Sequence, residues 1–164
     1  MAIFFLFCGY FAFMNTDLTD RLYNDFPQLY LGHTKPTAES SMSWGFQCDD
    51  GWYELIYSLS RQLTDYAKAH PDKIIEAFEV KEKFGWLRFH LVEADEATFE
   101  IIEQACVRSS ATCELTGEPG VLCVESFNRT NSRRPRYKVL CFVKAAELGF
   151  VPAKNAADGC GDPS

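Results

Sequence analysis

The sequence predicts an α+β fold, in which helices pack on an antiparallel β-hairpin and a degenerate zinc-ribbon-like segment follows. Three observations carry this prediction. Apolar residues recur at helical spacings of three and four in three stretches, they alternate with charged residues within residues 74–92, and turn residues between short apolar runs follow Cys113. The chain has 164 residues, of which 47% are apolar and 24% charged, as in ordinary globular proteins. One domain, or one domain with a small appendage, fits this length.

The first two helices are predicted from their apolar positions and from the residues at their ends. Residues 15–30 carry apolar side chains three and four positions apart, and Pro27 ends that helix. The second helix follows Asp49 and Asp50, one of which is its natural N-cap, and runs to about Ala69.

Two strands and a turn are predicted within residues 74–92. Apolar residues alternate with charged ones on both sides of Lys83-Phe84-Gly85, where the glycine can supply a positive φ. Each strand therefore has one apolar face, which we expect the helices to cover. A third helix is capped by Asp95 and ends near Ser109.

The two ends of the chain differ from the middle. Residues 1–13 have no charge, lack the basic start of a secretory signal, and are shorter than the roughly 20 apolar residues of a membrane span. We therefore expect Met14 to be the natural start and the protein to be cytoplasmic, with no membrane contact. The predicted parts are an upstream extension (1–13), an α+β domain (14–110), a ribbon-like segment packed on it (111–144) and a flexible tail (145–164).

The seven cysteines include two halves of zinc knuckles. A zinc ribbon binds its metal with two Cys-x2-Cys or Cys-x2-His pairs, because tetrahedral zinc needs four ligands. Here Cys113 is followed three residues later by Thr116, and Cys141 by Lys144. Two thiolates do not make a structural zinc site, so we expect no cofactor. Zinc binding completed by another ligand stays open as an alternative to buried, apolar cysteines.

The charge of the chain is unevenly distributed. Residues 126–144 carry six cations and no acid, and removing this +6 from the net charge of −7 leaves −13 on the rest. The basic segment is a candidate for nucleic-acid contact, for docking an acidic partner, or for a solvated loop. The candidate nucleic-acid residues are Arg129, Arg133, Arg134, Arg136 and Lys138.

No catalytic motif is present in the sequence, which has three histidines and lacks a P-loop, a Gly-x-Ser-x-Gly elbow and a His-Glu-x-x-His pair. We therefore predict a protein that is not an enzyme, with a small hydrolase or nuclease using Asp49, Asp50, His70 or His90 as an alternative. The tryptophans suggest an aromatic binding patch. The candidate partner-binding residues are Trp44, Asp49, Asp50, Trp52 and Trp86.

Three stretches carry a resemblance to a known family. They are Gly-Phe-Gln-Cys-Asp-Asp-Gly-Trp (45–52), Val-Lys-Glu-Lys-Phe-Gly-Trp-Leu-Arg-Phe (80–89) and Cys-Glu-Leu-Thr-Gly-Glu-Pro-Gly (113–120). They resemble a family of small proteins of tailed bacteriophages and prophages, whose members end in a Cys-x2-Cys-Gly and Leu-Cys-x2-His ribbon. This chain departs from that pattern at Thr116 and Lys144, both at zinc-ligand positions.

The resemblance implies a phage setting and supplies no activity. Small phage accessory proteins often act on host machinery or host defence, which is an analogy of setting. We therefore expect a phage accessory protein that binds a host protein and modulates or inhibits it, with bacterial defence systems among the candidate targets. A nucleic-acid-binding accessory protein is the alternative.

Overall fold

The computed structural model describes residues 12–126 and 135–153. Within them the chain is α+β, with helices and two small antiparallel sheets, as the sequence predicts. The helices are α1 (Thr16–Asp25), α2 (Tyr53–Ala69), α3 (Glu96–Ser109) and α4 (Phe142–Leu148). Short 3-10 turns are η1 (Leu31–Thr34), η2 (Ser41–Trp44) and η3 (Asp50–Trp52). The strands are β1 (Ala77–Lys83), β2 (Trp86–Leu91), β3 (Val121–Glu125), β4 (Tyr137–Leu140) and β5 (Phe150–Pro152).

The ends of the first three helices follow their local sequence. Helix α1 begins after Asn15, whose side chain accepts the amide of Leu18, and it ends two residues before Pro27. Helix α3 has the predicted cap, since the Asp95 carboxylate accepts a hydrogen bond from the Thr98 amide and the Thr98 hydroxyl oxygen accepts one from the Asp95 amide. These helix boundaries are confirmed.

The hairpin is confirmed as well, with Lys83 opposite Trp86 and Lys81 opposite Arg88. Both turn residues have positive φ, 57° at Phe84 and 81° at Gly85. This combination matches the right-handed twist of a two-residue hairpin, and glycine adopts it without steric cost.

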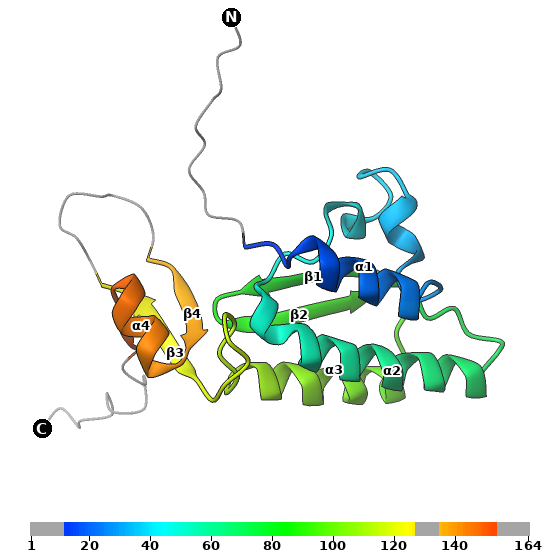
Figure 1. Cartoon of the computed structure of the whole chain (residues 1–164). Coiled ribbons are helices and arrows are strands. Elements are labelled where there is room, and N and C mark those ends of the chain that lie inside the picture. The colour runs from blue at the N-terminus through cyan, green and yellow to red at the C-terminus, as the bar shows by residue number, and fades with distance from the viewer. Residues whose placement is uncertain (1–11, 127–134, 154–164) are drawn as a thin grey trace, which may run out of the picture.

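The main core lies between the hairpin and the helices. In Figure 1, α2 and α3 run side by side along one face of β1 and β2. The inward hairpin residues Val80, Leu87 and Phe89 share one buried cluster with residues of α1, α2 and α3. Burying such side chains is worth about 1.5–3 kcal/mol each, so this face provides most of the driving force for folding.

A second, smaller core belongs to the C-terminal module, which we define as residues 111–126 and 135–153. Strand β3 pairs with β4 on one side and β5 on the other, and α4 packs on them. The buried cluster contains three cysteines, Leu140, Ala145 and Phe150. Figure 1 places β3, β4 and α4 beyond the turn of the hairpin.

The predicted tail is corrected here. Residues 145–152 are not a flexible tail, because they complete α4 and form β5, which hydrogen-bonds to β3. Helix α4 ends at Gly149, whose φ of 72° is the left-handed C-cap conformation. The short strand escaped prediction because Phe150 is the one buried residue in it. Residues 154–164 lie outside the described part of the chain.

The module attaches to the main domain through the loop Cys48–Trp52. The Gly51 amide donates to the Glu114 carbonyl at 2.7 Å, and the indole N–H of Trp52 donates to the Thr112 carbonyl at 2.8 Å. The hairpin turn adds a second contact, because the α-carbon of Gly85 faces the Leu122 side chain. Two of the motifs that carry the family resemblance therefore join the module to the main domain.

Gly51→Ala should destabilise the protein by about 2 kcal/mol or more, as overpacking does. A β-carbon there would lie 2.4 Å from the Cys113 carbonyl oxygen and 2.5 Å from the Thr116 amide nitrogen, both rigid backbone atoms. Urea unfolding measures the change. Gln104→Ala, on the exposed side of α3, is the control and should change the stability little. Equal stability of the two variants would contradict the close approach.

Candidate functional site

The most unusual cluster in the structure is a buried ion network where the module meets the main domain. The side-chain amine of Lys138 donates to Glu114 at 2.7 Å and to Asp49 at 2.8 Å. Glu114 is fully buried, and its other carboxylate oxygen accepts the Asp49 amide at 3.2 Å. Three segments, at residues 49, 114 and 138, are therefore held by one ammonium group.

The electrostatics of this network follow from burial and from an excess of acids. Burial, together with the charges of Asp49 and Glu82, raises the pKa of Glu114 to about 7, although Lys138 opposes this shift. Burial lowers the pKa of Lys138, but the charges of Glu114 and Asp49 outweigh it, so the net direction is upward. Lys138 therefore stays charged. Glu114 is the group that takes up a proton, because one ammonium cannot neutralise the surrounding carboxylates.

The two aspartates after Cys48 do not cap α2, which corrects the sequence prediction. Neither η3 nor α2 has a side-chain cap, and the Asp49 carboxylate instead binds Lys138. Asp50 accepts both the backbone amide of Asn15, at 2.8 Å, and its side-chain amide, at 2.7 Å. Both carboxylates therefore bind residues far away in the sequence.

Cys113 and Cys141, the cysteines that the sequence shows as halves of zinc knuckles, are brought together in the module. Cys113 is buried, and its sulfur is hydrogen-bonded by the Thr116 hydroxyl and by the amides of Cys141, Leu115 and Thr116. Burial raises the pKa of the Cys113 thiol, but these hydrogen bonds outweigh it, so the pKa is lowered. The Thr116 hydroxyl also lies 3.8 Å from the Cys141 sulfur, so it contacts both sulfurs.

The donor set does not fit zinc. The Gly117 amide bonds the Cys113 carbonyl in the turn after Cys113, and Cys141 is the N-cap residue of α4. Thr116 and Lys144 stand at the other two ligand positions, and a neutral hydroxyl and an ammonium are poor zinc ligands. Among the described residues, no group of three or more His, Cys, Asp or Glu side chains is placed to hold a metal ion.

The basic segment is only partly within the described residues. Arg129, Arg133 and Arg134 lie outside them. Arg136 forms a two-pronged ion pair with Glu125, at 2.8 and 2.9 Å, and Lys138 is the centre of the buried network. The amine of Lys138 is therefore already paired with two carboxylates within the protein.

The tryptophans do not form the predicted three-membered patch. Trp52 is fully buried and forms part of the main core, so its ring cannot meet a partner. Trp44 ends η2 with 59% of its surface exposed, and Trp86 opens β2 with 45% exposed. The alternation of apolar and polar residues in the hairpin predicts an exposed Trp86. The burial of Trp52 was harder to predict, because its indole N–H is satisfied by the carbonyl of Thr112, which is distant in the sequence.

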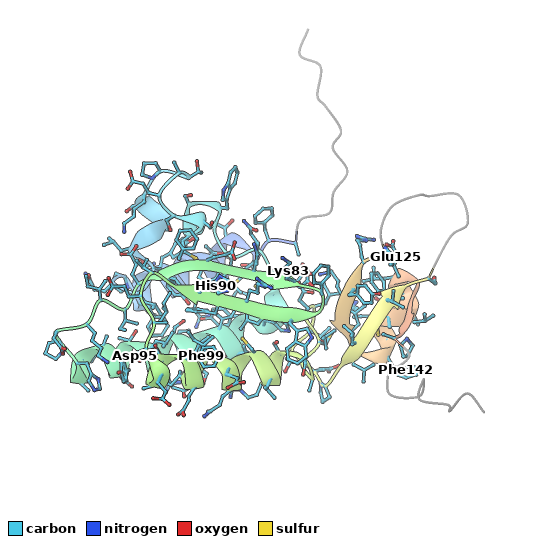
Figure 2. All side chains as sticks on the ribbon, turned by 180° about the vertical axis from the view of Figure 1, so that it is seen from behind. Lys83, His90, Asp95, Phe99, Glu125 and Phe142 are labelled. Atoms are coloured by element: carbon cyan, nitrogen blue, oxygen red, sulfur yellow. The ribbon has the colours of Figure 1, made fainter. Side chains whose placement is uncertain are left out.

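A cationic and aromatic surface covers the open face of the hairpin. We define the hairpin face by the exposed side chains of Lys83, Phe84, Trp86 and Arg88 together with partly buried Lys81. Lys81 lies directly opposite Arg88, so two like charges face each other. Lys81 has an ion pair with Glu79, whereas Arg88 has no salt bridge to any described residue. Figure 2 shows this hairpin from the side opposite to Figure 1, with Lys83 labelled near its turn.

The histidines and acids considered for catalysis have structural partners. His70 stacks on Tyr66 and bonds its carbonyl, and His90 lies 3.5 Å from Glu79. A shallow pocket near the start of α3 is lined by Tyr66, Lys73 and Asp95, among others. There Lys73, Thr98 and Tyr66 hold the pKa of the Asp95 carboxyl well below its usual range, so Asp95 remains an ionised cap.

Comparison of the chain with protein-family models, curated proteins and solved structures gives no match. No helix in the described part of the chain is both long and apolar enough to cross a membrane.

Thr116→Cys combined with Lys144→His should create a zinc site that binds one ion per chain and raises the melting temperature. The turn after Cys113 and the N-cap of α4 already hold the two cysteines, so the substitutions add only the two missing ligands. Zinc content after dialysis against a chelator measures the result. The same pair of substitutions in a Cys113→Ser chain is the control and should retain none. A double variant without zinc would show that the knuckle geometry is wrong.

Proposed function

We propose that this chain is a non-enzymatic binding protein that attaches to an acidic surface of another protein through the hairpin face. The observation that carries the proposal is the direct opposition of Lys81 and Arg88 beside the exposed ring of Trp86. Like charges opposite each other in a sheet oppose folding by a few tenths of a kcal/mol. An unfavourable interaction of this kind, retained on an exposed face, is typical of a functional surface.

The composition of the hairpin face suits binding. Tryptophan and arginine are the side chains that most often dominate protein interfaces, and both stand here on a rigid hairpin rather than on a loop. The cations lie on a chain whose net charge is −7. An acidic partner would approach this face and be repelled by acidic surfaces elsewhere, which favours one orientation.

The resemblance to phage and prophage proteins supports a more specific proposal. In that setting the partner is a protein of the bacterial host, and binding modulates or inhibits it. Components of defence systems are natural candidates for such inhibition. The protein would then act in the host cytoplasm.

Nucleic-acid binding is the second candidate. The hairpin face offers cations beside two exposed aromatic rings, Phe84 and Trp86, a combination that single-stranded nucleic acids also bind. The basic segment, of which Arg136 is a described residue, adds further cations to the chain. This alternative predicts binding that weakens steeply with salt.

Affinity capture from extracts of the bacterial host tests the proposal. The tagged wild-type chain should capture a defined protein, and Trp86→Ala with Arg88→Glu should reduce the capture at least tenfold, because it removes the aromatic anchor and reverses a charge. Phe99→Ala with Glu103→Lys makes a matched change on the exposed side of α3, which Figure 2 marks at Phe99, and should leave capture unchanged.

A nuclease-treated extract separates the two candidates. Capture that survives nuclease and fails in the hairpin variant supports protein binding. Capture that disappears with nuclease supports the nucleic-acid alternative, and capture that is equal for all three chains would overturn the role of the hairpin face.

A further inference from the structure

We propose that Cys113 and Cys141 form a two-coordinate thiolate site for a soft monovalent metal ion, of which Cu(I) is the biological representative. The site is distinct from the hairpin face, since it lies in the module between the knuckle and the start of α4. Its two sulfurs are the only strong metal ligands among the four side chains at the knuckle positions.

The sulfurs of Cys113 and Cys141 lie near the same groups in the fold. The Thr116 hydroxyl contacts both of them, and the Cys141 amide is hydrogen-bonded to the Cys113 sulfur. The knuckle and the N-cap of α4 therefore bring together two thiols that are 28 positions apart in the sequence. Both belong to free cysteines and are not joined in a disulfide.

The number of ligands selects the ion. Zinc requires four ligands, and the hydroxyl of Thr116 and the ammonium of Lys144 supply neither of the missing two. Soft thiolates favour Cu(I), which is stable with two sulfurs in a linear arrangement. Binding would form two copper–sulfur bonds and release two protons to solvent, with no change of oxidation state.

The surroundings suit the charge of that product. A Cu(I) ion with two thiolates carries a net charge of −1. Three backbone amides and one hydroxyl already donate to the Cys113 sulfur. Lys144 lies one turn into α4, where its ammonium is paired with Glu147 at 2.7 Å and is also within electrostatic reach of both sulfurs. These groups orient the ligands and compensate the charge, as residues around metal ligands do.

The site is accessible without unfolding of the module. Cys113 is fully buried, but Cys141 retains some surface, and Thr116 and Lys144 beside it are exposed or partly exposed. An ion delivered by a small carrier can therefore reach Cys141 first and Cys113 second. The third cysteine of this core, Cys123, directs its thiol to the Val121 carbonyl at 3.3 Å.

Anaerobic titration of the full chain with Cu(I) held by bathocuproine disulfonate tests the proposal. The wild-type chain should take one equivalent of Cu(I) from this competitor. Cys113→Ser and Cys141→Ser should each lose that equivalent. Cys106→Ser is the matched control, because this thiol bonds to the Leu87 carbonyl in the main domain, and the variant should bind like the wild type. Lys144→Glu should bind about tenfold more weakly.

Two further measurements keep the result decisive if a serine variant fails to fold. X-ray absorption of the wild-type chain with one equivalent of Cu(I) should show two sulfur ligands, and a shell of three sulfurs or of nitrogen would overturn the proposal. Titration with Zn²⁺ against a chelator should show no tight equivalent. Copper binding that is equal in wild type and both serine variants, or tight zinc binding by the wild type, would also overturn it.

Discussion

The buried amine of Lys138 is the interaction on which the arrangement of this protein depends. It bonds Glu114 in the knuckle and Asp49 in the loop before α2, while its own strand, β4, forms part of the small sheet. A buried charge that loses its partner typically costs about 3–5 kcal/mol. The network therefore contributes specificity: Asp49 and Glu114 both contact the Lys138 ammonium in this one arrangement, and the module is fixed to the main domain in one orientation.

This constraint changes the interpretation of the motifs on which the resemblance to phage proteins was based. Gly51, Trp52 and Gly85 join the module to the main domain through close backbone and side-chain contacts. Their presence in a sequence indicates this architecture and gives no direct information about binding. The hairpin face and the thiols of Cys113 and Cys141 take no part in this network.

Local patterns in the sequence predicted the local structure well. The helix ends at Asp25, Ala69 and Ser109 and the hairpin turn depend on neighbouring residues, so periodicity and capping found them. Helix α4 was missed because its exposed start, Phe142-Val143, continues the apolar run of β4 and resembles a longer strand.

Features that depend on distant residues were not predictable in the same way. The pair Asp49-Asp50 has the local chemistry of a helix cap, but Lys138 and Asn15 take both carboxylates. Glu114 was not identified from the sequence, because nothing near it indicates full burial or the facing ammonium. Glu114 lies in a segment rich in turn residues, and Lys138 is a single lysine in a short strand. The sequence therefore gives at most a weak indication that the two are paired.

Native-state hydrogen exchange in Lys138→Met tests the central claim, that this network joins the two parts of the protein. The Gly51 amide, which bonds the Glu114 carbonyl, and the Glu114 amide, which bonds Val139, report on the two sides of the junction. We expect the opening free energies of both to fall together, by about 3 kcal/mol. Loss of protection at Glu114 with unchanged protection at Gly51 would contradict the account, because the junction would then hold without Lys138.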